Sequence, residues 1–396
     1  MNLTLGKWLD RFLGIPLVYA ARGLEILRPG GRGRVQPRRI LMIKLWGAGN
    51  VVLIIPIIRA LKRRYPDARL AFLTLESNRS LLSSMKELDE VVALSQKSLI
   101  GCGASAVGAV RSLRRFSPDV LVDFEQFCRL SALLGWASGA PQRIGLKTPG
   151  QARDGLYTAK VPYDDRRHMS RTFLAVARVL GLAEEYAPES PLLSERDHSE
   201  AKDLMKAIDA LPGVGPRLVF HVGSGKNFRG RRWPVESWAE LARRLIDGHG
   251  VRILFTGVED ERDLVDACRS SVGRPTADGV GRCGLTGLAA LLGRVDALFS
   301  NDTAPVHLAG AVGCPVFGFY GPNTPRLYGP LGQADTVFYK ALPCSPCLTN
   351  LNAKESSCRL PTCIESITVD EVVAAFETWA SRNVAARSSE REENAS

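Results

Sequence analysis

A glycine loop that ends in an amide follows the first apolar run of the chain. Residues 44–50 read KLWGAGN, after the run RRILMI. Gly47 and Gly49 lack a Cβ, so the main chain of this loop can approach a phosphate or a sugar closely. Asn50 can orient a hydroxyl, but its amide cannot accept a proton at neutral pH. A reaction that removes a proton here would therefore need another residue as its base.

Two carboxylates lie near the end of a later apolar run, DVLVDFE (residues 119–125). If this run is a strand of the same parallel sheet, its end faces the same cleft as the glycine loop. The sequence then predicts Glu125 as the general base, with Asp123 as the next candidate. The alternative is that Glu125 is a surface acid and that the chain has lost activity.

A third group of polar residues occurs in the string SNDTAPVHLAGAVGCPVFGFYGP (residues 300–322). Asp302 and Thr303 follow a predicted strand and precede a predicted helix. Thr303 can cap that helix, whose free N–H groups and positive dipole end suit a diphosphate. His307 lies four residues beyond Thr303, on the same helical face. The alternative is an ordinary N-cap with a structural histidine.

Strands and helices alternate around these residues, and the alternation begins twice. The first series starts with the strand at residues 39–44, and the second starts with RLVFHVG (residues 217–223). Such alternation is typical of parallel sheets with crossover helices. We therefore predict an α/β fold with two doubly wound domains that face a central cleft. The predicted segments are an amphipathic N-terminal segment and linker (1–37), an N-terminal domain (38–190), an interdomain crossover (191–215), a C-terminal domain (216–384) and a disordered tail (385–396).

Composition and charge narrow the partners of the chain. Its 396 residues carry a formal charge of +11, which favours an anionic partner. No block of Lys and Arg interleaved with aromatic residues appears, so nucleic acid is not expected. The N-terminal stretch WLDRFLGIPLVYAARGLEIL is apolar with basic flanks, and the basic string RPGGRGR follows it. Either this stretch packs on the protein as a helix, or it binds an acidic membrane surface.

Four of the nine cysteines cluster in one Pro- and Asn-containing segment. A C-x-x-C pair followed by two further cysteines suits a structural zinc ion, and the alternative is free thiols in a loop. Disulfides would need an oxidising compartment. The candidate zinc ligands are Cys344, Cys347, Cys358 and Cys363.

Four segments together resemble glycosyltransferase family 9, the ADP-heptose:lipopolysaccharide heptosyltransferases. They are RRILMIKLWGAGNVVLIIPIIRALKRRYPDARL, DVLVDFEQFCRLSALLGWASGAPQRIG, FHVGSGKNFRGRRWPVESWAELARRL and SNDTAPVHLAGAVGCPVFGFYGP, and they occur in the family order. The resemblance implies a GT-B fold of two Rossmann-like domains. It also implies inverting sugar transfer from a nucleotide diphosphate sugar, without a cofactor for catalysis, to a lipid-linked saccharide. Such an enzyme is expected in the cytoplasm, peripheral on the inner face of the cytoplasmic membrane.

The resemblance also implies roles for individual residues. In the family the first loop usually ends in Gly-Asp, and that Asp is the proposed base, so Asn50 departs from the pattern. Arg231 stands where the family usually has Lys, and it keeps the charge with a forked geometry. Glu259 would accept hydrogen bonds from the ribose, and Leu285 would line the base pocket. The residues expected at the sugar diphosphate are Gly223, Ser224, Arg231, Arg232, Asp302, Thr303, Ala304 and His307.

Two other functions remain open from the sequence. One is a catalytically inactive protein that binds a nucleotide sugar, which Asn50 makes conceivable. The other is a dinucleotide-dependent oxidoreductase, although the first loop lacks the G-x-G-x-x-G fingerprint.

Overall fold

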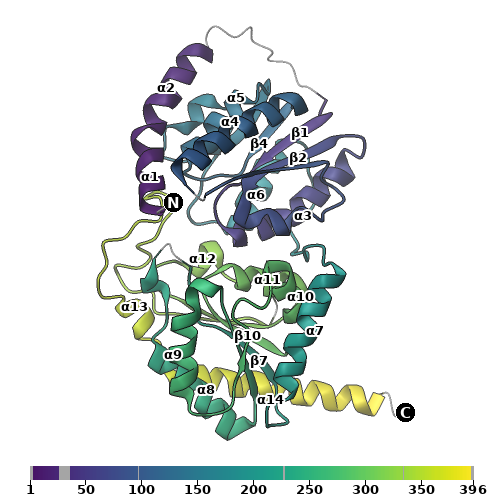
Figure 1. Cartoon of the computed structure of the whole chain (residues 1–396), viewed down its shortest axis with the longest axis vertical. Coiled ribbons are helices and arrows are strands. Elements are labelled where there is room, and N and C mark those ends of the chain that lie inside the picture. The colour runs from purple at the N-terminus through teal and green to yellow at the C-terminus, as the bar shows by residue number, and fades with distance from the viewer. Residues whose placement is uncertain (1–2, 26–35, 97, 226–227, 333, 394–396) are drawn as a thin grey trace.

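Two parallel sheets of six strands each form the frame of the molecule in the computed structural model (Figure 1). The structure describes residues 3–25, 36–96, 98–225, 228–332 and 334–393. The first sheet contains β1 (Arg39–Ile43), β2 (Arg69–Leu75), β3 (Glu90–Leu94), β4 (Val120–Asp123), β5 (Gln142–Lys147) and β6 (Ala159–Pro162). The second contains β7 (Arg217–His221), β8 (Arg252–Thr256), β9 (Ala277–Asp278), β10 (Ala297–Asn301), β11 (Val316–Tyr320) and β12 (Thr336–Tyr339).

The two sheets have the same strand order. It is β3-β2-β1-β4-β5-β6 in the first sheet and β9-β8-β7-β10-β11-β12 in the second. In each sheet the chain starts at a central strand, builds outward, and then returns to the other side of that strand. The predicted pair of doubly wound domains is therefore confirmed. Ligands of this fold bind where the order reverses, outside the carboxyl ends of β1 and β4 and of β7 and β10.

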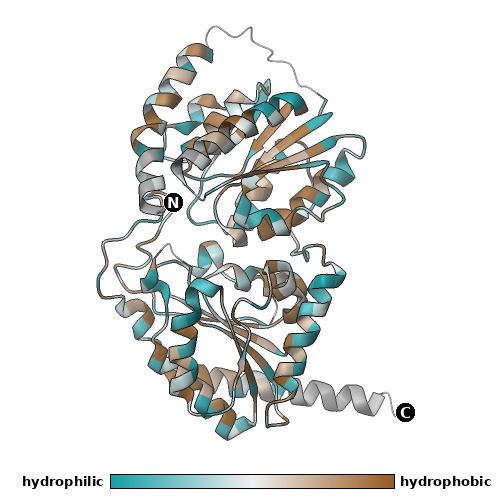
Figure 2. Cartoon of the chain, viewed as in Figure 1, coloured by the Kyte–Doolittle hydropathy of each residue, from teal (hydrophilic) through white to brown (hydrophobic). Residues whose placement is uncertain are grey.

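Helices cover both faces of each sheet, which explains why the central strands β1, β4, β7 and β10 are almost entirely buried. Along β1, Ile40 and Met42 enter one hydrophobic core, while Leu41 and Ile43 enter another on the opposite face. In Figure 2 the strands are mostly brown, with teal residues on the outer helices. The helices that cover the first sheet are α3 (Ala48–Arg64), α4 (Leu99–Phe116), α5 (Arg129–Ala137) and α6 (Met169–Arg178). Those of the second half are α7 (Glu195–Asp209), α8 (Val235–His249), α9 (Arg262–Val272), α10 (Leu285–Leu292), α11 (Ala304–Val312) and α14 (Val369–Glu393), with the short α12 (Pro325–Tyr328) and α13 (Thr362–Glu365).

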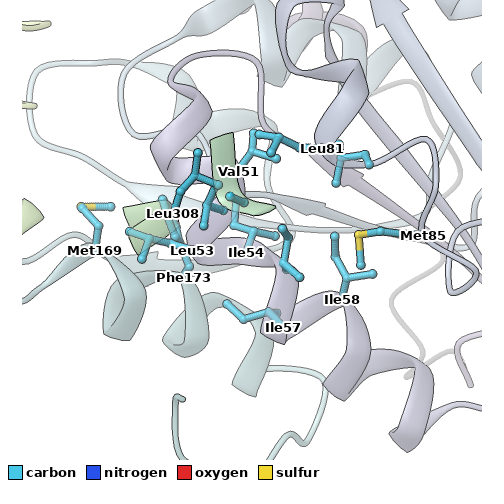
Figure 3. Close-up of a cluster of buried hydrophobic side chains, with 14 of the residues drawn as sticks. Val51, Leu53, Ile54, Ile57, Ile58, Leu81, Met85, Met169, Phe173 and Leu308 are labelled. Atoms are coloured by element: carbon cyan, nitrogen blue, oxygen red, sulfur yellow. The ribbon is translucent and has the colours of Figure 1, made fainter. Parts of the chain in front are cut away.

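One hydrophobic core joins the two halves. It contains residues of α3 and α6 from the first half together with residues of α7, α10 and α11 from the second. Figure 3 shows Leu308 of α11 beside Val51 and Leu53 of α3, with Met169 and Phe173 of α6 nearby. The domains are thus in a closed arrangement, in which α3 and α11 contact each other across the cleft.

Three segments differ in detail from the sequence-based expectations. The N-terminal stretch forms two helices, α1 (Leu3–Phe12) and α2 (Gly14–Glu25), and the basic string RPGGRGR lies outside the described residues. The crossover contains α7, which starts with a capping box between Ser194 and Asp197. Finally, α14 continues to Glu393, into the segment predicted to be disordered, where Ala, Arg and Glu have high helix propensity.

Candidate functional site

The glycine loop of the first half lies against the second half. A Cβ added to Gly49 would lie 2.5 Å from Cδ2 of His307 and 3.3 Å from the Cα of Ala304. Gly49 thus allows the N-terminus of α3 to approach the N-terminus of α11. Gly47 has φ +87°, in the left-handed region that favours glycine. In this structure the glycines of the loop therefore allow two helices to approach each other. The sequence had suggested that they allow the main chain to approach a phosphate or a sugar.

Asn50 lies in the first turn of α3, and its main-chain N–H donates to the carbonyl of Gly47. Its side-chain Oδ1 is buried and has no hydrogen-bond partner among the described residues. Buried polar atoms are rarely left without a partner, so such an atom in a cleft indicates a place for a ligand or a water. A side-chain amide oxygen can accept a hydrogen bond from a sugar hydroxyl.

Glu125 is fully buried at the end of β4. Its Oε1 accepts hydrogen bonds from the main-chain N–H groups of Leu45 and Trp46, both at 2.7 Å. Its Oε2 is 2.8 Å from Nζ of Lys44, which is also buried. These contacts tie the glycine loop to the end of β4, and they occupy the oxygen atoms that a base would use. The geometry therefore gives no support to Glu125 as the general base, and it indicates a positioning role.

Asp123 is equally buried and equally occupied. Its Oδ2 accepts hydrogen bonds from Ser131 at 2.8 Å, and from Arg153 and Tyr157 at 2.7 Å each. Its Oδ1 accepts from the main-chain N–H of Glu125 at 2.9 Å. With both oxygens taken, Asp123 has no path to an acceptor hydroxyl in this arrangement. Both carboxylates that were predicted as bases thus connect the carboxyl end of β4 to neighbouring parts of the first domain.

The loop after β7 is held by a carboxylate that was not among the predicted site residues. The main-chain N–H groups of Ser224 and Gly225 donate to Oε1 of Glu261, at 3.1 and 3.0 Å. A Cβ on Gly223 would lie 2.2 Å from that carboxylate, so a larger residue there would displace the side chain of Glu261. Gly223 and Ser224 lie at the switch point of the second sheet, where the sequence predicts them. Their loop, however, contacts Glu261 in this structure.

Arg231 and Arg232 lie beside this loop. Arg231 donates to the carbonyl of Asp302 at 2.9 Å and to that of Ser224, and its Nη1 is 3.6 Å from Oδ2 of Asp302. Arg232 donates to Oγ of Ser224 and lies 3.8 Å from Glu261. Both guanidinium groups are thus fixed next to the carboxyl ends of β7 and β10. Their positive charge would there offset the negative charge of a bound anion.

Asp302 and Thr303 occupy the turn between β10 and α11. Asp302 is buried, and its Oδ2 accepts a 2.7 Å hydrogen bond from Nδ2 of Asn323. Thr303 is the N-cap residue, but its hydroxyl makes no capping bond and donates instead to the carbonyl of Asn301 at 3.2 Å. The first turn of α11, which begins at Ala304, is therefore not capped by a side chain. Such a helix end suits a diphosphate.

Each half contributes one buried histidine near the contact between the two halves. Burial, and then the charges of His168 and Lys354, lower the pKa of His307 to about 3. Burial also lowers the pKa of His168 to about 4, although its Nε2 lies 3.1 Å from the carbonyl oxygen of Gly329. Both rings are therefore neutral at pH 7. His307 packs on Gly49, and its Nδ1 is buried without a protein partner among the described residues.

The two residues expected at the nucleoside lie after β8 and at the start of α10. Glu259 opens the short turn after β8, is exposed, and pairs with Arg262 at 2.6 Å. Leu285 begins α10 and packs against the shared core. Because Glu259 and Glu261 are only two residues apart, sequence spacing could not tell which one turns toward the loop after β7. Asn323 was not predicted from the sequence either, since its only signal is its place in a turn after β11.

The cysteine cluster lies in the segment between β12 and α14. Burial, and then the nearby thiols of Cys347, Cys344 and Cys358, raise the pKa of Cys363 to about 11. Across the ranges that the structure describes, no three His, Cys, Asp or Glu side chains are arranged to hold a metal ion. The thiols as placed therefore do not form the tetrahedral set that zinc requires.

Comparisons with known proteins identify the family of the chain. The sequence model described as glycosyltransferase family 9 (heptosyltransferase) matches residues 109–357. Lipopolysaccharide heptosyltransferase 2 of Salmonella typhimurium is 28% identical over 76% of this chain and 87% of its own. A glycosyl transferase family 9 structure from Veillonella parvula superposes with a TM-score of 0.72 at 20% identity, covering 87% of this chain and 97% of its own.

An E. coli heptosyltransferase solved with ADP has a TM-score of 0.62 at 19% identity, over 86% of this chain and all of its own. The fold shared with these structures is the GT-B arrangement of two Rossmann-like domains. The family match spans well over half of the chain. The chain therefore belongs to glycosyltransferase family 9, the heptosyltransferase family.

Proposed function

We propose that this protein transfers a heptose from a nucleotide diphosphate sugar, of the ADP-heptose type, to a lipopolysaccharide-type or other lipid-linked saccharide. The observation that carries the proposal is the juxtaposition at the two switch points. The uncapped start of α11, with Asp302, Arg231 and Arg232, lies opposite the buried amide oxygen of Asn50. A donor diphosphate fits the first group, and an acceptor hydroxyl fits the second.

The donor half of this proposal can be tested by titration. Asp302→Ala should weaken the binding of ADP-heptose at least tenfold, because it removes the partner of Asn323 and of Arg231. Asp247→Ala, which removes an exposed partner of Arg274, is the matched control. Unchanged donor affinity in a folded Asp302→Ala variant would contradict the donor site. Measurements on the unchanged protein also test the two rival functions. An inactive binder would hold ADP-heptose without turnover. An oxidoreductase would bind a nicotinamide dinucleotide instead.

Within this reaction we assign Asn50 to orient the acceptor hydroxyl. Its Oδ1 would accept the hydroxyl hydrogen bond as the oxygen attacks the anomeric carbon. Because an amide cannot take the proton, the proton would pass to water in the cleft. Glu125 and Asp123 would hold the loop that carries Asn50, through Lys44, Leu45 and Arg153.

We further propose that the α1–α2 pair binds an acidic membrane surface, so that the enzyme is cytoplasmic and peripheral on the inner face of the membrane. Val18 and Ala21 pack on the first domain, while the two helices also carry large exposed apolar residues. These are Trp8, Phe12, Leu13, Leu17, Tyr19 and Leu24. Arg11 and Arg22 add positive charge beside them. In the part of the chain that the structure describes, no helix is long and apolar enough to cross a membrane.

Vesicle sedimentation tests this membrane contact. The full chain should sediment with vesicles of phosphatidylethanolamine and phosphatidylglycerol, and less so at high salt, because ions screen the basic residues. A Phe12→Glu/Leu17→Glu variant should remain in the supernatant. Val107→Glu, which changes an exposed apolar residue of α4, should sediment as the full chain does. Equal sedimentation of all three proteins would contradict the proposal.

We also propose that the segment 344–363 binds a structural zinc ion after its thiols rotate toward one another. The C-x-x-C spacing supports this, as does the influence of the other three thiols on Cys363. Metal analysis of the purified chain should find about one zinc per chain, and Cys347→Ser should abolish it. A metal-free chain with four thiols that react with a thiol reagent would contradict it.

A further inference from the structure

The segment between β12 and α13 connects both halves of the molecule at the cleft. Within it, Asn350 donates to the hydroxyl of Tyr163 at 2.6 Å and accepts from the hydroxyl of Tyr328 at 2.8 Å. The carbonyl of Leu351 accepts from Nε2 of Gln151 at 3.0 Å. Tyr163 and Gln151 belong to the first half, and Tyr328 to the second. The segment is therefore placed by contacts to both domains rather than by the sheet alone.

Positive φ angles occur in this segment at Ala341 and at the adjacent Ala353 and Lys354. Ala353 has φ +55° and Lys354 has φ +58°, so two successive non-glycine residues are left-handed. Residues with a Cβ rarely adopt this conformation. The conformation is held by a 2.8 Å hydrogen bond from the N–H of Lys354 to the carbonyl of Thr349. Strain of this kind is found preferentially at functional sites, where it directs a side chain.

The side chain of Lys354 is directed at the residues of the donor site. Its Nζ lies 3.7 Å from the centroid of the Tyr328 ring and 3.4 Å from Oδ1 of Asn323. Nδ2 of Asn323 in turn donates to Oδ2 of Asp302 at 2.7 Å. The charge of Lys354 also helps to lower the pKa of His307, which places the ammonium group near the start of α11.

A further cation at this place has a chemical use. When the bond between the sugar and the diphosphate breaks, negative charge develops on the leaving diphosphate. Fixed positive groups that face this charge stabilise the transition state, above all where no metal does so. Arg231 and Arg232 approach from the loop after β7, whereas Lys354 approaches from the segment after β12.

We propose that Lys354 is a donor-binding residue that contacts the diphosphate, and that the 344–363 segment serves to present it. This inference rests on the proposed function, since it assumes a diphosphate donor at α11. It adds a substrate contact that was not predicted from the sequence, from a segment outside the motif strings.

Calorimetric titration with ADP tests the proposal. Lys354→Met should weaken ADP binding about 10- to 100-fold, as expected for the loss of a charge-assisted contact. Lys354→Arg should retain most of the affinity, because it keeps the charge. Lys340→Met is the matched control, since Lys340 lies at the other end of the same segment and pairs with Glu371. The loss in Lys354→Met should be larger for ADP than for adenosine, which lacks the phosphates.

The possible results separate the two proposals. If the unchanged protein binds ADP and a folded Lys354→Met variant binds it equally well, the role of Lys354 is refuted while the proposed function stands. A Lys354→Met variant in which only the KM for the acceptor changes would refute the diphosphate contact in the same way. If the unchanged protein binds neither ADP, GDP nor UDP, both proposals fail.

Discussion

At the scale of single residues, the decisive feature is an amide at position 50, where the family usually has an acid. Asn50 has a buried, unpartnered Oδ1, while the nearest candidate acids, Asp123 and Glu125, are each engaged by several protein donors within the described part of the chain. A protein of this design would catalyse transfer by orientation and charge stabilisation, without a positioned base.

Restoring an acid should therefore accelerate the reaction. A positioned base typically contributes about 10²–10⁴-fold, so we expect Asn50→Asp to raise kcat by at least tenfold. The rate of this variant should also rise with pH through the pKa of the new carboxyl group, because only the carboxylate can take the proton. Steady-state kinetics over a range of pH measures both effects. A rate for Asn50→Asp at or below that of the unchanged protein would show that position 50 does not meet the acceptor hydroxyl.

Glu125→Gln should act on stability more than on chemistry. It leaves the buried charge of Lys44 without its partner, which costs about 3–5 kcal/mol in typical buried pairs. Denaturant unfolding measures the loss, and the double variant Lys44→Met/Glu125→Gln should recover part of it. Glu76→Gln, which breaks an exposed pair with Arg79, should cost at most about 1 kcal/mol. Normal stability of Glu125→Gln together with a turnover lowered a hundredfold would instead restore Glu125 as the base.

At the scale of elements, the central feature is the contact between the N-termini of α3 and α11. The sequence predicted both helices, and it predicted that a glycine loop precedes the first. It could not show that Gly49 meets His307, because this contact joins two distant parts of the chain and depends on domain closure.

A side chain at position 49 should separate the two domains. The Cβ of Gly49→Val would lie 2.5 Å from the ring of His307, closer than real contacts allow. We expect a larger radius of gyration in small-angle scattering and weaker donor binding. Gly108→Val is the control, because a Cβ at Gly108 in α4 meets nothing within 4 Å. Identical scattering from Gly49→Val and the unchanged chain would mean that the closed contact does not hold the domains.

The elements themselves could largely be predicted from the sequence, and their side-chain roles could not. The strands at 39–43 and 69–75 follow from their apolar runs, since a strand buried on both faces leaves that signature. The role of Glu125 depends on Lys44, which lies 81 residues earlier in the chain. That of Lys354 depends on a strained segment that no periodicity indicates. Long-range pairing of polar groups is therefore the part that the sequence does not predict.

At the scale of the whole molecule, buried histidines make the stability of the fold sensitive to acid. His168 and His307 have folded pKa values of about 4 and about 3, well below the ordinary value near 6.5, because they are buried. Below pH 6.5 the unfolded chain binds these protons and the folded chain does not. Stability is therefore complete above pH 6.5 and falls as the pH decreases toward the folded pKa values.

The expected slope is up to about 1.4 kcal/mol per pH unit for each histidine. Urea unfolding at pH 7 and pH 5 measures it, above the range in which most carboxylates titrate. The double variant His168→Gln/His307→Gln should lose the part of this dependence that these two rings contribute, while His221, whose pKa burial also lowers, keeps its own part. His198→Gln, which changes an exposed histidine, should leave the dependence unchanged. A free energy of unfolding that is equal at the two pH values would contradict the burial of the two rings.

The most direct test of the proposed transfer is an assay with the purified chain. ADP-heptose and a heptose-deficient lipopolysaccharide acceptor are incubated with the protein, and mass spectrometry of the acceptor is combined with a measurement of released ADP. We predict that the acceptor gains one heptose for each ADP released, without added metal. ADP-heptose that remains bound and unconsumed in the presence of acceptor would contradict the proposed transfer and would favour an inactive nucleotide-sugar-binding protein.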